Sequence, residues 1–465
     1  MSALSIVAAA EEAPDADALV VEGATLSFPE VAERVLALGA SLPPAEEGAS
    51  VALTPRLEAS SLCAMLACIE RGLPMLLLPS RFTAPERARA LAQVSDAWGS
   101  PPRVWEELTR ASTSGPGQAS STLALVLTSG TTGTPRVASL SRAAFLSAAH
   151  ASEANLGWQR DDRWLLTMPP AHVGGLSILV RCLMARRAVV LADSPQFDPA
   201  QLAHQLERDR VTLLSLVPTM LRRLLDHDPR WRPPSALRAV LVGGAAFPPE
   251  LAREARERGL PTLATYGMTE TCAQLATQPY ARRGLAEVGV GPALPGLSLR
   301  VRDGRIEASG PTLMDGYLGV SDHEQPFTDD GWLRTGDLGQ LDGAGWLQVL
   351  GRADDLILSG GENVAPQEVE AALLTLPGVR DACVFGQADS EWGQRVCAAL
   401  VLDATAAPLA TLLSGLRATL AGHKLPRGVA LLDALPSSAK GGVDRPRVAR
   451  LALAVGLHPW LPESP

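Results

Sequence analysis

The chain has 465 residues, 46% of them hydrophobic and 20% charged, which is the composition of a globular protein with two or three packed domains. Its net charge of -9 argues against nucleic acid as a partner, because nucleic-acid-binding proteins present a basic face to phosphates. No apolar run reaches the ~20 residues of a membrane span, and the first basic residue, Arg34, comes too late for a secretory signal. The six cysteines form no CxxC pair, so we expect reduced thiols and a cytoplasmic protein.

The first part of the chain alternates between short helices and strands. Apolar spacing predicts a helix over residues 32–42. Residues 110–122 are rich in Ser, Gly and Thr and indicate an exposed linker. After this linker, "LALVLTSG" (123–130) is typical of a buried strand that ends in a glycine-rich turn, and Ser141 is placed to cap the helix that follows.

A βαβ unit is clearest over residues 237–267. A strand over Leu237–Val242 leads into a Gly-Gly turn, then into a helix that begins at a Pro-Pro pair and ends at Gly259, and then into a second strand. Parallel strands with crossover helices are therefore the main architecture that the sequence predicts, which is an α/β fold.

The pattern changes after about residue 285. Short strands joined by Asp-Gly and Gly turns predict antiparallel structure or a small β-barrel. The remainder predicts an α+β unit, with helices and strands over residues 366–376, 381–387, 395–403 and 409–423. We therefore expect a large domain of parallel sheets over residues 1–353 and a smaller α+β domain over residues 354–465.

A candidate anion-binding loop follows the buried strand, in "LTSGTTGTPR" (127–136). Backbone N–H groups of such a loop can surround a phosphate, and the Ser and Thr hydroxyls add donors. The loop lacks the spacing of a Walker A motif. The alternative is an ordinary surface turn, since Ser, Thr and Gly are common in turns.

A second candidate site lies in "ATYGMTETC" (264–272), at the end of the second strand of the βαβ unit. Ligands of open α/β sheets bind beyond the carboxyl ends of the strands. There Tyr266 is suited to stack on a purine, Thr269 to donate to a phosphate, and Glu270 to bind Mg²⁺.

The segments "SGTTGTPR", "YGMTE", "RTGD" and "GRADDLILSGGEN" occur in this order along nearly the whole chain. Together they resemble the acyl-adenylate-forming superfamily, which includes acyl- and aryl-CoA ligases, peptide-synthetase adenylation domains and luciferases. The resemblance implies a mobile C-terminal domain, and it implies ATP, Mg²⁺ and CoA as cofactors and co-substrate.

The resemblance also implies a role for each matching position. It places the ATP phosphates on the loop formed by Thr128, Ser129, Gly130, Thr131, Thr132 and Gly133. It places the rest of the nucleotide against Gly243, Gly244, Ala245, Tyr266, Gly267 and Met268. Thr269 then contacts the α-phosphate and Glu270 binds Mg²⁺.

Further roles follow for Asp337 of "RTGD", which would hold the ribose hydroxyls, and for Arg352, which would contact phosphate or ribose. Asp354 would be the hinge of the small domain, and Gly360 and Gly361 would face the thiol channel of CoA. A turn aspartate at Asp337 and a surface ion pair between Arg352 and Asp354 are the structural alternatives.

His172, in "PPAHVGGLS", matches a residue that separates the acyl pocket from the thiol channel; a core histidine is the alternative. The segments around it, with "LVPTMLRRLL" and "VLVGGAAFPPEL", resemble the o-succinylbenzoate–CoA ligases of menaquinone synthesis. Arg222 or Arg223 would then meet a second carboxylate of the substrate, unless it is a solvated helix cation.

The sequence departs from the family at two cations. Arg136 ends the phosphate loop where lysine is usual, and Gly442 stands where the C-terminal motif has its catalytic lysine. Only two of the 41 basic residues are lysine, Lys424 and Lys440, and both fall in family motifs. We predict that Lys440, two residues before Gly442, supplies the missing cation; the alternative is that adenylation is lost.

We therefore expect an enzyme that activates an aromatic carboxylic acid as an acyl-adenylate and transfers it to CoA, with o-succinylbenzoate as the acid. One alternative is an adenylation-impaired acyltransferase that moves a benzoyl or anthraniloyl group from CoA to the thiol of an acyl carrier protein. Another is a non-catalytic ligand-binding relative, against which the intact nucleotide motifs argue.

Overall fold

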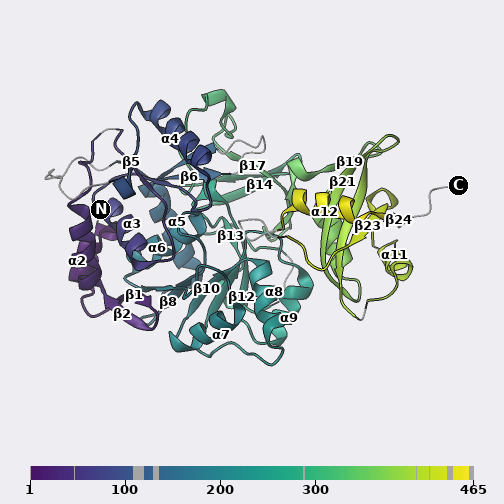
Figure 1. Ribbon diagram of the computed structural model, residues 1–465, viewed down its shortest axis with the longest axis horizontal. Helices are drawn as coiled ribbons and strands as arrows, with labels where there is room; N and C mark the ends of the chain where they lie inside the picture. The colour runs from purple at the N-terminus through teal and green to yellow at the C-terminus, as the bar shows by residue number, and fades with distance from the viewer. Residues whose placement is uncertain are drawn as a thin grey trace.

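The computed structural model describes residues 2–46, 48–107, 120–128, 136–285, 289–404, 406–417, 419–436 and 443–459. The chain forms a large N-terminal part and a smaller C-terminal part that lie side by side along the longest axis of the molecule (Figure 1). Most of the linker predicted at residues 110–122 lies outside the described residues.

The largest sheet has eight strands in the order β13-β12-β11-β10-β8-β9-β1-β2, and its six central strands are parallel. Its strands are β1 (Asp17–Val21), β2 (Ala24–Ser27), β8 (Arg163–Leu166), β9 (Ala188–Leu191), β10 (Leu213–Leu216), β11 (Ala239–Val242), β12 (Thr262–Tyr266) and β13 (Ala276–Thr277). The helices that follow β8 to β11 are α6 (Val173–Ala185), α7 (Pro199–Arg208), α8 (Pro218–His227) and α9 (Pro249–Glu257). The predicted βαβ unit is therefore confirmed as β11-α9-β12.

The second sheet has six strands in the order β16-β7-β6-β4-β3-β5. They are β3 (Val51–Leu53), β4 (Met75–Leu77), β5 (Arg103–Val104), β6 (Thr122–Thr128), β7 (Arg136–Ser141) and β16 (Gly316–Tyr317). The N-terminal helices are α1 (Ile6–Glu12), α2 (Phe28–Gly39), α3 (Ala59–Glu70), α4 (Ala84–Trp98) and α5 (Arg142–Leu156). The predicted helix at 32–42 begins earlier, because Ser27 and Glu30 form a capping box, and the predicted Ser141 cap is confirmed.

The antiparallel region after residue 285 forms a four-stranded sheet in the order β14-β15-β17-β18. Its strands are β14 (Ser298–Arg302), β15 (Arg305–Ser309), β17 (Leu333–Leu341) and β18 (Leu347–Arg352). The first and last strands are not paired in the described part of the chain, so the small barrel that the sequence predicted is an open sheet there. Antiparallel pairing, the other expectation for this region, is confirmed.

The C-terminal part has its own sheet and its own cores. The sheet consists of β19 (Ile357–Ser359), β20 (Glu362–Val364), β21 (Val379–Asp389), β22 (Gly393–Leu402), β23 (Gly428–Leu431) and β24 (His458–Pro459), which are packed with α10 (Pro366–Leu374), α11 (Leu409–Arg417) and α12 (Arg445–Val455). The apolar clusters on its two faces contain only residues from Ile357 onward. The domain boundary at Asp354 stays a prediction.

The six cysteines are all free and buried, as expected of core-filling thiols. Across the described ranges, no helix has the length and apolar character that a membrane crossing requires.

Candidate active site

The parallel strands β11 and β12 end beside each other and place two motifs at one edge of the large sheet. Gly243 follows β11 directly, and a Cβ on it would lie 2.6 Å from the Thr265 side chain, so only glycine fits. Gly244 has a φ of +78° and is exposed with Ala245, which leaves this turn open to a ligand. The predicted Gly243–Ala245 segment thus lies beside the end of β12.

Tyr266 and Asp337 are 71 residues apart in the chain, yet the Tyr266 hydroxyl donates to Asp337 Oδ2 at 2.7 Å. Burial raises the pKa of the Tyr266 phenol, and the Asp337 carboxylate raises it further, so the phenol stays protonated and donates. Arg352 lies opposite Asp337 in the β17–β18 register, and its guanidinium donates to Asp337 Oδ1 at 3.2 Å. The structure therefore brings three predicted site residues into one network.

The glycine of "RTGD" makes room for this network. A Cβ on Gly336 would lie 2.5 Å from the Arg352 guanidinium. Asp337 is only 9% exposed, so its carboxylate is held by two donors in a largely dehydrated position. A carboxylate oriented in this way is suited to accept hydrogen bonds from vicinal hydroxyls such as those of ribose.

The "YGMTE" segment turns sharply after β12. Gly267 has no space for a side chain, since a Cβ would come 1.5 Å from the Ala273 carbonyl oxygen. Met268 and Thr269 lead into a short 3₁₀ helix, η3 (Thr269–Thr271), and the next two residues take positive φ values of 51° and 89°. Backbone strain of this kind clusters at functional sites.

Glu270 lies in η3, and its carboxylate accepts a hydrogen bond from the Tyr317 hydroxyl at 2.6 Å. Burial and the charge of Glu270 raise the pKa of Tyr317, so this hydroxyl also acts as a donor. Sequence reasoning missed Tyr317, which lies 47 positions from Glu270 and carries no motif of its own that the analysis used.

The candidate phosphate loop connects β6 to β7, which pair with Thr128 opposite Arg136. The Thr128 hydroxyl donates to the Arg136 carbonyl at 3.4 Å, and the Arg136 guanidinium lies 5.3 Å from the Tyr317 ring centre. The predicted phosphate ligands Ser129, Gly130, Thr131, Thr132 and Gly133 lie outside the described residues. Both ends of the loop therefore lie against the residue that bonds Glu270.

A Mg²⁺ site was expected at Glu270. Among the residues that the structure describes, no group of three or more His, Cys, Asp or Glu side chains is placed to hold a metal. Mg²⁺ at phosphate-transfer sites needs only one or two carboxylates, with phosphate oxygens and waters completing its shell. One oriented carboxylate beside the base of a phosphate loop fits a Mg²⁺ that arrives with ATP.

His172 is the residue that precedes α6, and its backbone N–H donates to the Pro169 carbonyl at 3.0 Å. The turn needs glycine, because a Cβ on Gly175 would lie 2.4 Å from that same carbonyl oxygen. His172 is partly exposed, a position compatible with the predicted gate as well as with a structural histidine.

Other predicted residues lie apart from this network. Gly360 and Gly361 form the exposed turn between β19 and β20, with φ values of +62° and +85°, on the sheet of the C-terminal part. Lys424 pairs with Glu368 of the same part at 2.6 Å. Lys440 and Gly442 lie outside the described residues.

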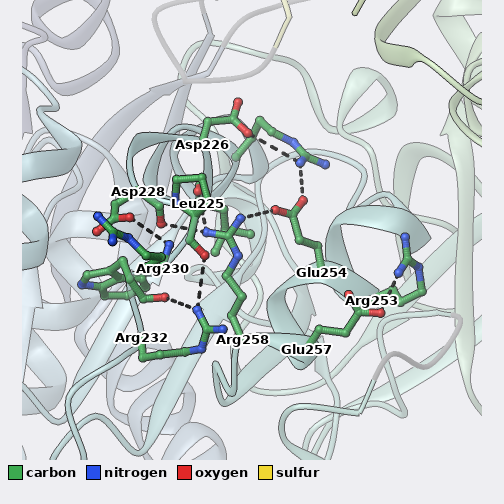
Figure 2. A network of polar contacts seen from close by, with 12 residues as sticks. Leu225, Asp226, Asp228, Arg230, Arg232, Arg253, Glu254, Glu257 and Arg258 are labelled. Carbon is green, nitrogen blue, oxygen red and sulfur yellow. Dashed lines mark hydrogen bonds and ion pairs between the residues drawn. The ribbon is translucent and has the colours of Figure 1, made fainter. Parts of the chain in front are cut away.

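The two arginines proposed for a second carboxylate are engaged elsewhere. Arg222 ion-pairs with Glu254 of α9 and lies 3.9 Å from Asp226. Figure 2 shows that Glu254 also holds Arg258, at 2.7 Å. Arg223 donates to the Phe197 carbonyl at 3.0 Å and stacks over the Phe197 ring. Because α8 directs both cations into contacts with neighbouring segments, the structure gives no support to their binding a second carboxylate, and that role stays a prediction.

A better candidate is Arg181, which sequence reasoning missed although it is a lone charge in the apolar run "GLSILVRCLMA". Arg181 is 3% exposed, and its Nε and one terminal nitrogen have no hydrogen-bond partner among the described residues. Its guanidinium lies 5.5 Å from the Trp164 ring centre and near Cys272, which follows Glu270 by two positions in the chain. Burial lowers its pKa to about 10, as expected of a cation without an anion.

Two family models and a set of known enzymes match this chain. A family model described as AMP-binding enzyme matches residues 93–318, and one described as AMP-binding enzyme C-terminal domain matches residues 368–441. The 2-succinylbenzoate–CoA ligase of Bacillus pumilus is 33% identical over 468 aligned positions, which cover 94% of this chain and 95% of the ligase.

One Bacillus subtilis enzyme, the o-succinylbenzoate CoA synthetase MenE, is similar in three solved states at 30% identity. The TM-score is 0.82 for its complex with the acyl-adenylate intermediate OSB-AMP (95% of this chain, 97% of that one). It is also 0.82 for the complex with ATP and a magnesium ion (96% and 98%). It falls to 0.68 for a double mutant with the product analogue OSB-NCoA, at 96% and 97% coverage. The chain belongs to the AMP-binding enzymes of the acyl-adenylate-forming superfamily.

Proposed function

We propose that the protein is an ATP- and Mg²⁺-dependent ligase that joins 2-succinylbenzoate to CoA through an acyl-adenylate. The observation that carries this proposal is the network of Tyr266, Asp337 and Arg352 beside the Glu270–Tyr317 pair, at the ends of β11 and β12. The activities named for the relatives that cover nearly the whole chain support the same reaction. We place this reaction in the cytoplasm.

In the first half-reaction a carboxylate oxygen attacks the α-phosphorus of ATP, the bond to the β-phosphate oxygen breaks, and pyrophosphate leaves. Bound Mg²⁺ would offset the charge of the phosphates, and Glu270 is the residue that would hold it. Asp337 and Tyr266 orient the ribose end of the nucleotide, and Arg352 adds a cation on the same side. These residues place two anions together, which is the main electrostatic difficulty of the step.

Arg181 suits the substrate proposed. 2-Succinylbenzoate carries two carboxylates, of which one is activated and the other must be buried without reacting. A buried guanidinium with unused N–H donors offers that second carboxylate a charge-assisted hydrogen bond. The Trp164 ring beside it provides an apolar wall.

In the second half-reaction the CoA thiolate attacks the acyl carbon, and AMP leaves. Gly360 and Gly361 are exposed on the C-terminal part, so we propose that this part turns about Asp354 to bring them to the acyl-adenylate. The fall in TM-score from 0.82 to 0.68 within one enzyme, at nearly equal coverage, supports two placements of the parts. His172 would then separate the acyl pocket from the thiol channel.

The experiment that tests the proposal is ATP–pyrophosphate exchange, followed by CoA thioester formation, with 2-succinylbenzoate and with simple aryl acids. We expect exchange that needs both Mg²⁺ and 2-succinylbenzoate. Gly442 at the usual lysine position favours one other function, aryl transfer from CoA to a carrier-protein thiol. Transfer without exchange would select that function and overturn ours.

A further inference from the structure

We propose that Tyr317 is a positioning residue that ties the Glu270 carboxylate to both ends of the phosphate loop, so that the site binds the metal complex of ATP better than free ATP. This inference rests on the proposed role of Glu270 as the Mg²⁺ ligand.

The backbone around Tyr317 bridges the two sheets that carry the site. The Met314 N–H donates to the carbonyl oxygen of Glu270 at 2.9 Å. The Asp315 N–H donates to the carbonyl oxygen of Ser139 at 2.9 Å, and Tyr317 pairs with Ala138 in the β16–β7 ladder. A segment of few residues is thus bonded at one end to the turn that holds Glu270 and along its length to the strand that leaves the phosphate loop.

The Tyr317 side chain repeats this bridge. The Tyr317 hydroxyl donates to Glu270 Oε1 at 2.6 Å. The Arg136 guanidinium lies over the Tyr317 ring, 5.3 Å from the ring centre. The Thr128 hydroxyl, which donates to the Arg136 carbonyl, lies close to the phenol as well. Thr128 and Arg136 are the residues on either side of the loop, so a single ring contacts both strand ends and the candidate metal ligand.

Gln325 fixes the position of Tyr317. Its side-chain oxygen accepts from the Tyr317 N–H at 2.8 Å, and its side-chain nitrogen donates to the Tyr317 carbonyl at 2.8 Å. Both backbone polar groups of Tyr317 are therefore held by one amide, which restricts the directions that the ring can take.

The consequence is an orientation of Glu270 that is set before the nucleotide binds. A donor on Oε1 fixes the carboxylate plane and leaves Oε2 to face a cation beside the loop. Loss of such an outer partner of a metal-ligating group typically lowers metal affinity by about 10- to 100-fold. Removal of the Tyr317 hydroxyl should thus lower the affinity for the metal ion and leave the affinity for free ATP nearly unchanged.

The test compares Tyr317→Phe, Glu270→Gln and the control Tyr280→Phe, which removes a hydroxyl from a ring that stacks with Arg283 and Arg238 instead. Mn²⁺ binding to the enzyme–ATP complex is measured by electron paramagnetic resonance, and ATP binding without a divalent ion by calorimetry. We expect Tyr317→Phe to weaken Mn²⁺ binding by about tenfold or more, with unchanged binding of free ATP. Tyr280→Phe should match wild type in both measurements.

Three results would overturn the inference in distinguishable ways. If Glu270→Gln loses Mn²⁺ but Tyr317→Phe binds it as wild type does, Tyr317 does not position the ligand. If Glu270→Gln itself binds Mn²⁺ normally, the proposed role of Glu270 is wrong and the inference falls with it. If Tyr317→Phe weakens the binding of free ATP and of Mn²⁺ equally, Tyr317 has only a structural role.

Discussion

The nucleotide site of the large part and the contact between the two parts are held together very differently. Asp337 is 9% exposed and accepts from both Tyr266 and Arg352. By contrast, Arg380 of β21 reaches Asp226 of α8 across the two parts at 2.6 Å, with side chains 54% and 34% exposed. Buried, multiply bonded groups resist displacement, whereas exposed ion pairs contribute little and exchange readily with water.

This difference suggests which region of the molecule each half-reaction depends on. Tyr266, Asp337 and Arg352, which would hold the ribose end of ATP, are already assembled in the large part, whereas the predicted catalytic cation would come from the C-terminal part. The turn of Gly360 and Gly361 is exposed. In the proposed reaction this turn moves to the acyl-adenylate, so the contact between the two parts would have to break and re-form. Variants that act on one region should therefore affect one half-reaction.

The largest effect on adenylation is expected from Lys440→Ala. If Lys440 replaces the cation missing at Gly442, its removal takes a positive charge from a developing anionic centre, which typically costs about 10²–10³ in rate. Pyrophosphate exchange measures this loss, and thioester formation from added acyl-adenylate should be spared. Lys424→Ala is the matched control, since Lys424 pairs with Glu368. Equal rates of pyrophosphate exchange by wild type and Lys440→Ala would show that Lys440 does not take part in adenylation.

The converse effect is expected from Asp354→Pro. Asp354 lies in the 3₁₀ helix η6 (Ala353–Asp355), whose φ values a proline accepts, so the present arrangement should persist. A placement that needs another φ would be disfavoured by ~3 kcal/mol, on the order of a hundredfold. Single-turnover assays should show normal adenylate formation and slow thioester formation.

The control for this variant is Asp354→Ala, which removes the 3.4 Å contact with Arg352 without fixing φ. It should leave both half-reactions close to wild type. A similar loss of both half-reactions in Asp354→Pro would count against a hinge at this residue.

A smaller, substrate-specific effect is expected from Arg181→Met. A hydrogen bond to a charged group contributes about 1.5–3 kcal/mol, so kcat/KM for 2-succinylbenzoate should fall by roughly 10- to 100-fold. An analogue without the ring carboxylate is the control, because it lacks the group that Arg181 would bind and should lose little. The unfolding temperature should hold or rise, since an apolar side chain replaces an unpaired buried charge. Equal losses for both acids would remove Arg181 from substrate recognition.

The smallest effect is expected from Arg380→Gln. Exposed ion pairs contribute about 0.2–1 kcal/mol, so the balance between the two placements should move by at most about fivefold, toward faster thioester formation. High salt should reduce the difference between variant and wild type. Arg253→Gln is a matched control, since Arg253 is 51% exposed and pairs with Glu250 and Glu257 of its own helix. If both variants behave alike, the Arg380–Asp226 pair has no part in the balance.

Local signals in the sequence were sufficient for much of the fold. The βαβ unit is marked by a buried strand, a Gly-Gly turn, a Pro-Pro helix start and Gly259, all within one short segment. The helix α12 was missed, because its Arg-rich sequence has only Val448 and Ala452 buried and gives a weak apolar period. The predicted helix at 409–423 ends earlier, at Arg417.

Some residues of the candidate site could also be identified from local sequence motifs, and others could not. Ordered motifs identified Tyr266, Asp337 and Arg352, but their meeting depends on strand register across three separate segments. Tyr317 and Arg181 were missed because a single tyrosine and a single arginine carry no spacing pattern. The contacts of Arg222 with Glu254 and of Arg223 with Phe197 could not be foreseen, because distant segments supply these partners.

The most direct test of the account is ATP–pyrophosphate exchange by the wild-type protein with 2-succinylbenzoate and Mg²⁺, in the absence of CoA. The account predicts exchange that depends on the acid, with thioester formed once CoA is added. No exchange with any aromatic acid, together with aryl transfer from CoA to a carrier-protein thiol, would contradict it.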